Sequence, residues 1–129
     1  MTNLDLFALI SETDKLKSVY RHSYLSDLSR NENSAEHSWH LCIALLALQP
    51  QMPAEVDLNH AIRLALTHDI CEIGAGDASI FSDERNGKYE LEAAYMTEFR
   101  SRFGATGALA EQYWLEYEAQ ETVESNWVK

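Results

Sequence analysis

Four polar side chains, His68, Asp69, Glu72 and Asp77, lie among mostly apolar residues in the segment LTHDICEIGAGD. On a helix His68 and Asp69 would lie about 100° apart, and Glu72 would follow one turn later, so the three could face one point beside the helix. Ionised groups on an inner face destabilise a fold unless they are paired, hydrogen-bonded or bound to a metal. Imidazole and carboxylate together suit a divalent cation such as Mn, Fe, Co, Zn or Mg. The segment therefore predicts part of a divalent-metal site.

Such a site needs a further ligand from another element, and His37 in NSAEHSWHL is the best candidate. It falls in the first turn of the most apolar predicted helix, which must pack against the helix that carries His68 and Asp69. Taken separately, His37 is typical of a structural residue at a helix start, and a His–Asp pair is typical of a hydrogen-bonded buried dipeptide. The combination favours metal ligation.

Helical spacing of apolar residues, with no strand pattern, predicts an all-α fold of five to six helices that positions these side chains. The expected helices run from near Asn3 to about Tyr20, from Ala35 to about Leu48, from Leu58 to about Ile73, around Leu91–Phe103, around Leu109–Tyr117, and from Val123 onward. Side chains that cap free N–H groups stand at three of these starts, namely Asn33 with Glu36 (or Ser34 alone), Asp57, and Thr122. The segment RHSYLSDLSRNEN lacks periodicity and predicts a connecting loop, either irregular throughout or with one short helical turn.

Composition narrows the class of protein. A chain of 129 residues is one domain by size, and its net charge of -11 argues against a binder of nucleic acid polymers. A few local cations could still hold a small anion. The longest apolar run, Leu41–Leu48, is too short to span a bilayer. Cys42 and Cys71 are expected as reduced core thiols, so we expect a cytoplasmic protein with no membrane partner.

Three segments, AEHSWHLCIALLAL, ALTHDICEIGAGD and YWLEYEAQETVESNWVK, resemble the HD-domain metal-dependent phosphohydrolases. The resemblance covers the chain from about Leu16 to Lys129. The spaced H…HD pattern is typical of the superfamily as a whole. The combination with EYEAQET is more specific for the branch that contains the bacterial 5'-deoxynucleotidases. It implies an HD-domain helical bundle, an activity that releases phosphate from (deoxy)nucleoside 5'-monophosphates, and a homodimer.

The resemblance also implies roles for the residues of the HD segment. His37, His68 and Asp69 would be the metal ligands, for Mn, Co, Zn, Fe or Mg. Glu72 and Asp77 would be the catalytic acidic pair, which positions or deprotonates the attacking water and protonates the leaving group. The glycines between Glu72 and Asp77 allow a tight turn toward the metal.

One substrate contact follows from the resemblance, together with two departures from the pattern of the branch. Arg21 would bind the substrate phosphate, but His22 stands where the branch commonly has a large aromatic residue for nucleotide stacking. The family closes the metal site with a further aspartate a few residues beyond Lys129, and no Asp follows Asp83 here. We therefore expect residues 1–129 to form a single HD domain that lacks its C-terminal helix or helices, binds metal weakly and is inactive as it stands.

A second hypothesis belongs to a different class of protein. The chain would be a non-catalytic, all-helical binding or regulatory module that keeps the HD fold without its metal. A divalent ion bound by His37, His68 and Asp69 would separate the two hypotheses.

Overall fold

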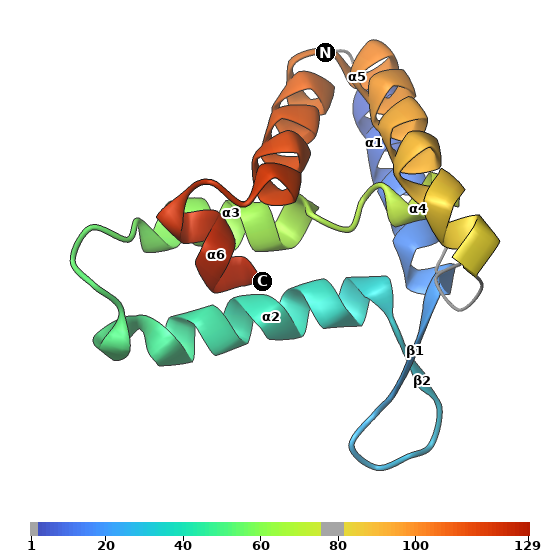
Figure 1. Cartoon of the computed structure of the whole chain (residues 1–129). Helices are drawn as coiled ribbons and strands as arrows, with labels where there is room; N and C mark the ends of the chain where they lie inside the picture. Colours follow the sequence, from blue (N-terminus) through green and yellow to red (C-terminus); the bar gives the residue numbers. More distant parts are fainter. Residues whose placement is uncertain (1–2, 76–81) are drawn as a thin grey trace.

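The computed structural model describes residues 3–75 and 82–129, with helices forming most of the structure and one small hairpin beside them (Figure 1). The elements in chain order are α1 (Asn3–Asp14), η1 (Lys15–Ser18), β1 (Tyr20–Tyr24), β2 (Asn31–Asn33), α2 (Ser34–Leu48), η2 (Gln49–Gln51), α3 (Leu58–Thr67), α4 (Glu72–Ala75), α5 (Ser82–Ala119) and α6 (Val123–Val128). No helix of the described residues is long and apolar enough to cross a membrane.

The three predicted helix starts are confirmed. Asn33 and Glu36 form a reciprocal capping box at the start of α2, in which each side chain accepts a hydrogen bond from the other residue's backbone N–H. Asp57 accepts from the backbone N–H of His60 at the start of α3. Thr122 accepts from the backbone N–H of Ser125 at the start of α6. These are local contacts, which is why the sequence reveals them.

The prediction of a helix from Asn3 to about Tyr20 and a loop after it was wrong in detail. The α-helix ends at Asp14 and continues as the short 3-10 helix η1. The expected loop folds back as an antiparallel hairpin, with Tyr20 opposite Asn33 and Tyr24 opposite Asn31. Most side chains of β1 are exposed on both faces, so the strand shows no alternation of apolar and polar residues that could have predicted it.

The predicted helix from Leu58 to about Ile73 breaks in the middle. α3 ends at Thr67, and residues 68–71 form a turn before α4 begins at Glu72. The apolar period continues across the break because Ile70 and Cys71 are buried by the turn instead of by a helix. His68 and Asp69 therefore lie at a junction between two helices and not on one continuous helix.

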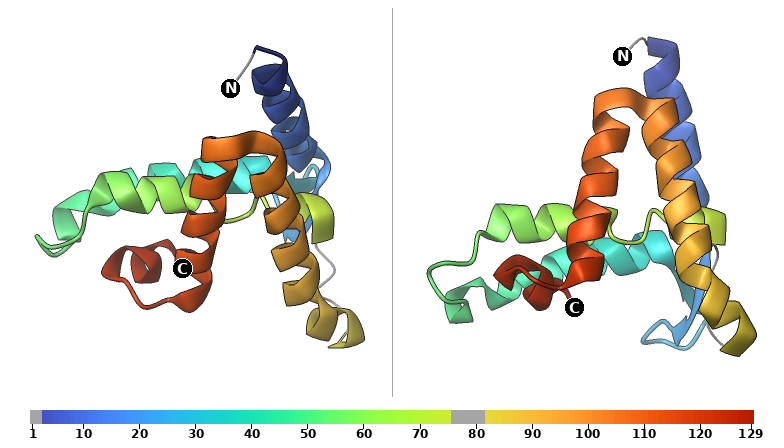
Figure 2. Two further views of the ribbon diagram at one scale, coloured as in Figure 1. Left: turned by 90° about the horizontal axis from the view of Figure 1, so that it is seen from above. Right: turned by 45° about the horizontal axis from the view of Figure 1, so that its top comes forward.

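The long helix α5 is bent into two arms, in agreement with the two helices expected around Gly104. Gly104 has a φ of +56°, which L residues with a side chain rarely adopt, and Phe103 also departs from helical geometry. A Cβ on Gly107 would lie 2.5 Å from the carbonyl oxygen of Phe99, so the close approach of the arms needs a glycine there. Figure 2 shows the arms diverging from this bend, with α1 along the first arm.

The core has two parts. α2 and α3 lie side by side with α6 packed against them (Figure 1). The apolar cluster at this junction contains Cys42, Leu45, Ala61, Leu64, Ala65, Tyr113 and Val128. The second cluster lies between α5 and the turn after α3 and contains Ile70, Cys71, Met96, Phe99, Phe103, Ala110 and Trp114. Both cysteines are buried free thiols, as expected.

A buried carboxylate joins α1 to the first arm of α5. The Glu12 side chain is 5% exposed and accepts a hydrogen bond of 2.6 Å from the Tyr95 hydroxyl. Its other oxygen lies 2.9 Å from Lys15 Nζ and 3.3 Å from Arg102 Nη1. Burial by itself would raise the pKa of Glu12, but the Tyr95 hydrogen bond and the two cations outweigh it and hold that pKa below its ordinary value.

We predict that Glu12→Gln lowers the free energy of unfolding by about 1–3 kcal/mol at neutral pH, through loss of charge-assisted hydrogen bonds. A depressed folded-state pKa stabilises the fold above the unfolded pKa of about 4.5 and loses that effect as the pH falls through the folded value. The difference between the two proteins in urea unfolding should therefore shrink between neutral and acid pH. A difference that stays the same at acid pH would contradict the assigned ion pairs.

Candidate metal centre

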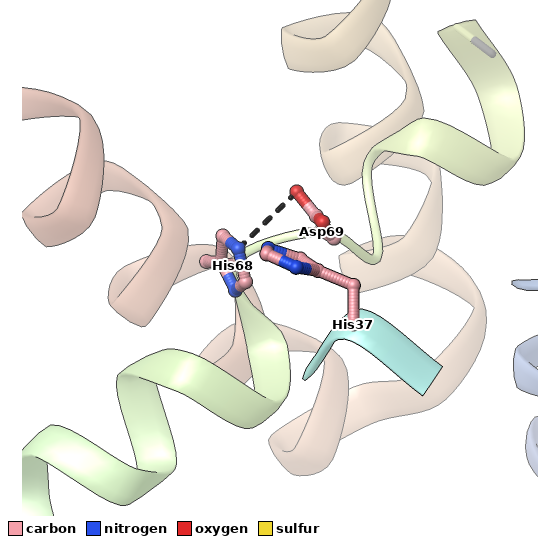
Figure 3. Close-up of side chains that lie close together, drawn as sticks. All are labelled: His37, His68 and Asp69. Carbon is pink, nitrogen blue, oxygen red and sulfur yellow. Dashed lines mark ion pairs between the residues drawn. The ribbon is translucent and has the colours of Figure 1, made fainter. Parts of the chain in front are cut away.

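The structure brings His37, His68 and Asp69 together. His37 lies in the first turn of α2, and the other two lie in the turn between α3 and α4. One ligand atom from each residue lies within 4.8 Å of the others (Figure 3). Two imidazoles and one carboxylate at this spacing match the donor set that divalent transition metals take in proteins.

The ring of His68 is fixed so that one nitrogen remains available. Its Nδ1 lies 2.7 Å from the carbonyl oxygen of Ala65, and since that oxygen can only accept, Nδ1 carries the proton. Nε2 is then the free nitrogen, 3.4 Å from Asp69 Oδ1. The ring also packs against Tyr117, with 4.9 Å between the ring centroids. A histidine held through Nδ1 by a carbonyl has the arrangement usual for metal ligands.

Two further observations fit a cation at this point. Asp69 Oδ2 is buried and has no hydrogen-bond partner among the residues that the structure describes. Burial of the His37 ring lowers its pKa, and the Arg21 charge acts in the same direction, although Asp69 and Glu32 oppose them. A neutral imidazole beside a carboxylate oxygen that lacks a hydrogen-bond partner favours the binding of a divalent ion.

Arg21 approaches the same centre from the hairpin. Its Nη1 lies 3.8 Å from Asp69 Oδ2, and its Nε lies 3.4 Å from Oε1 of Glu32. The Arg21 side chain keeps 31% of its surface exposed. The guanidinium therefore stands next to the three donors and remains within reach of a ligand from solvent.

Glu72 lies close to this centre in the chain but is not in the group of three donors. It begins α4, and its Oε1 lies 3.2 Å from Nζ of Lys88 on α5. Burial raises the pKa of Glu72 to about 8; the Lys88 ammonium opposes that rise, whereas the Asp69 charge and a hydrogen bond with Glu92 add to it. Glu92 also accepts a hydrogen bond of 3.2 Å from the Cys71 thiol. Asp77, the other predicted catalytic carboxylate, lies outside the described residues.

Comparison with known proteins identifies the family of this chain. Residues 13–129 match the model of the HD domain. The chain belongs to the HD domain family. A crystal structure of a predicted metal-dependent phosphohydrolase from Magnetospirillum magnetotacticum MS-1 superposes with a TM-score of 0.85 and 33% sequence identity. That match covers 97% of this chain and 65% of the other, so the chain spans about two thirds of the length of that relative.

A second solved structure resembles this HD domain in fold. It is a conserved hypothetical protein from Pyrococcus furiosus, with a TM-score of 0.73 and 24% identity over 95% of this chain and 69% of the other. No curated protein matches the chain. The predicted helical HD fold and the resemblance to the family are thus confirmed, and the 5'-deoxynucleotidase branch stays a prediction. The expected divalent-metal cofactor agrees with the family and with the donors gathered in this HD domain.

One residue of this centre was not among the predicted ones. Glu32 on β2 contacts Arg21 and also approaches His37, with 3.6 Å between Oε1 and Nδ1. Its neighbours Asn31 and Asn33 give it no distinctive motif. Only the hairpin of this HD domain, which the sequence did not predict, brings Glu32 to the site.

Proposed function

We propose that this HD domain is a metal-dependent phosphohydrolase that releases phosphate from (deoxy)nucleoside 5'-monophosphates. The observation that carries the proposal is the group formed by His37, His68 and Asp69, whose donor atoms lie within 4.8 Å of one another. The similarity to the predicted metal-dependent phosphohydrolase from Magnetospirillum supports the same reaction class. The nucleotide substrate rests on the sequence resemblance to the 5'-deoxynucleotidase branch.

In this proposal His68 Nε2, Asp69 and one nitrogen of His37 hold the cation. When bound, a divalent cation polarises a phosphoryl oxygen and lowers the pKa of a coordinated water toward neutral pH. The Ala65 carbonyl keeps His68 in the required tautomer. Asp69 Oδ2, which lacks a hydrogen-bond partner among the described residues, is available for the ion.

Arg21 binds the phosphate of the substrate in this proposal. Its guanidinium carries several N–H donors in one plane, which suits two oxygens of a phosphate at once. The present partners of Arg21 are carboxylates at 3.4 and 3.8 Å, both longer than a charge-assisted hydrogen bond. A phosphate can therefore compete for the guanidinium. This local cation also offsets the overall charge of -11 that would otherwise repel an anionic substrate.

Glu72 and Asp77 manage protons in this proposal. Glu72 is buried, so its carboxyl is shielded from bulk water, and Lys88 holds one of its oxygens in place. A positioned carboxyl group of this kind transfers protons to or from reacting oxygens. Asp77 shares the role by the sequence resemblance alone.

The test joins metal binding with phosphate release. After dialysis against Mn²⁺, Co²⁺ or Zn²⁺, elemental analysis should find about one ion per chain, and the loaded protein should release phosphate from nucleoside 5'-monophosphates but not from the matching 3'-monophosphates. This proposal departs from the weak metal binding and inactivity expected above, because three donors already lie within 4.8 Å of one another. A chelator should abolish the release, and returning the metal should restore it. Metal without any phosphate release would contradict the proposed reaction and leave the metal centre standing. Absence of metal would contradict the proposed centre.

The homodimer and the cytoplasmic location belong to the same proposal. Large apolar side chains are exposed on α1, where Leu6, Phe7 and Ile10 keep about half or more of their surface accessible. Exposed apolar groups of this kind are common where two chains meet. Light scattering of the purified protein should give twice the mass of one chain, and a monomer would contradict the dimer without affecting the proposed reaction.

A further inference from the structure

The register of the hairpin places Glu32 between two residues of the proposed centre. Tyr20 pairs with Asn33 and Tyr24 pairs with Asn31, with a shift of register between the two pairs. Next to the first pair, Arg21 on β1 and Glu32 on β2 approach each other, with 3.4 Å between Arg21 Nε and Glu32 Oε1. α2 begins immediately after β2, at Ser34. His37 therefore lies only one helical turn beyond the strand that carries Glu32. A carboxylate at this point can reach both the guanidinium and the imidazole.

One oxygen of Glu32 faces both of these groups. Oε1 lies 3.4 Å from Arg21 Nε and 3.6 Å from His37 Nδ1. The Glu32 side chain is 18% exposed, so its charge is only partly screened by water. Arg21 Nε itself is buried and has no formed hydrogen bond within the described part of the chain. Asp69 also lies near both groups, but Glu32 is the carboxylate whose oxygen lies 3.6 Å from Nδ1 of His37.

The two histidines of the centre show the same arrangement. His68 presents Nδ1 to the Ala65 carbonyl, which leaves Nε2 free. His37 presents Nδ1 to Glu32. Histidines that ligate metals generally donate their second ring N–H to a carbonyl or a carboxylate, which fixes the tautomer and the direction of the ring. Glu32 therefore lies on the Nδ1 side of His37, as the Ala65 carbonyl lies on the Nδ1 side of His68, but at 3.6 Å instead of 2.7 Å.

We propose that Glu32 is a positioning residue for the metal centre: its carboxylate accepts the Nδ1–H of His37 and directs Nε2 toward the cation shared with His68 and Asp69. The inference rests on the proposed metal site and adds a residue to it. The present separation of 3.6 Å is longer than a formed hydrogen bond. Glu32 and His37 must therefore come closer when a cation holds the ring.

A purely structural role for Glu32 gives a different expectation. If Glu32 only paired with Arg21 to hold the hairpin, its removal would change folding stability and leave the His37 ring and the metal affinity alone. If it acted only through its negative charge, any neutral replacement would weaken metal binding equally. The experiment must therefore separate charge from hydrogen bonding.

The first measurement needs no substitution. In the metal-free protein, long-range nitrogen–proton NMR correlations of the His37 ring, followed upward in pH until the ring is neutral, report which nitrogen carries the proton. We expect the proton on Nδ1. A proton found on Nε2 would overturn the inference, whatever the enzymatic activity turns out to be.

The second measurement compares Mn²⁺ affinity among matched variants. Glu32→Met has a similar length but no acceptor, and Glu32→Gln removes the charge but keeps an acceptor oxygen. Glu55→Gln removes one charge at an exposed position distant in sequence and serves as the control. We expect the dissociation constant for Mn²⁺ to rise about 10-fold or more in Glu32→Met, which is the usual cost of losing such a partner. Glu32→Gln should stay within about 3-fold, and Glu55→Gln should not change.

The outcomes separate this inference from the proposed function. If the unchanged protein binds no Mn²⁺, the proposed metal centre fails as a whole. If it binds Mn²⁺ and Glu32→Met binds equally well, only the role of Glu32 is wrong. Equal losses in the Met and Gln variants would show a charge effect and would also overturn the positioning role. Thermal unfolding of each variant checks that it is folded, and the tautomer measurement decides the matter if Glu32→Met does not fold.

Discussion

Replacing His68 with alanine is expected to abolish both divalent-metal binding and phosphate release. His68 is 5% exposed and supplies one of the three donors that lie within 4.8 Å of each other. Without it, the group of donors in the described part of the chain has one imidazole and one carboxylate left. Two ligands are too few for a stable metal site. Because the cation accounts for several kcal/mol of transition-state stabilisation, we expect kcat/KM to fall by about 1000-fold or more.

Asp69→Asn provides the matched variant, because it keeps the shape of the side chain and removes the charge. It should lose metal to a similar extent, since Asp69 is the only carboxylate in the group of three donors. His40→Ala is the control, because His40 is exposed on α2 and stacks on the neighbouring Trp39. Elemental analysis and phosphate release are measured on all three. Turnover that survives in both His68→Ala and Asp69→Asn would end the enzyme hypothesis.

Arg21→Ala is expected to raise KM for a nucleoside monophosphate by about 10- to 100-fold, the effect of losing a charge-assisted contact to phosphate. Metal content should stay the same or rise slightly, because the substitution removes a cation 3.8 Å from Asp69. This combination separates a residue that binds substrate from one that binds metal. Steady-state kinetics and elemental analysis on the same preparation provide both numbers.

Arg21→Lys is the informative companion, because lysine keeps the charge but loses the planar pair of donors. It should fall between the original protein and Arg21→Ala in KM. A change in metal content that exceeds the change in KM would contradict the assignment, and so would a KM that does not change in Arg21→Ala. In either case Arg21 would be a structural partner of Glu32 and Asp69.

Glu72, the proposed active-site carboxyl group, was predicted from the sequence, but its contacts were not. It contacts Lys88 and is buried together with Glu92 and Cys71. None of these three contacts was predicted: Cys71 and Glu92 stand in segments with an apolar or helical pattern, and Lys88 stands before the helix expected around Leu91–Phe103. An ion pair between residues far apart in the chain does not affect the local apolar pattern of either segment, because the pair depends on how α4 packs against α5.

Local chemistry was readable from the sequence. The caps at Asn33, Asp57 and Thr122 were predicted and are present, since each bond spans only three residues. The bend at Gly104 was predicted as a helix end, because glycine alone adopts its positive φ readily. The types of the candidate donors, two imidazoles and an aspartate, already indicated a divalent cation over a thiolate-preferring one.

Two features were not readable, and the tertiary structure decided both. The apolar period continues past Thr67, yet the chain turns at residues 68–71, because burial against α5 satisfies the same apolar residues without a helix. The hairpin has no alternating pattern because β1 is exposed on most of its length. The spacing of apolar residues indicates which residues are buried. It does not distinguish a buried turn from a buried helix, or an exposed strand from an exposed loop.

The sequence by itself determined which residue types this HD domain has for holding a cation and where its helices begin. Only the tertiary structure decided that His37 lies beside His68 and Asp69, because their proximity depends on the packing of α2 against α3. Only the tertiary structure placed Glu32 near His37, because that contact depends on the hairpin. Bonds between near neighbours are set by local backbone geometry, whereas contacts between distant segments are set by the packing of whole elements.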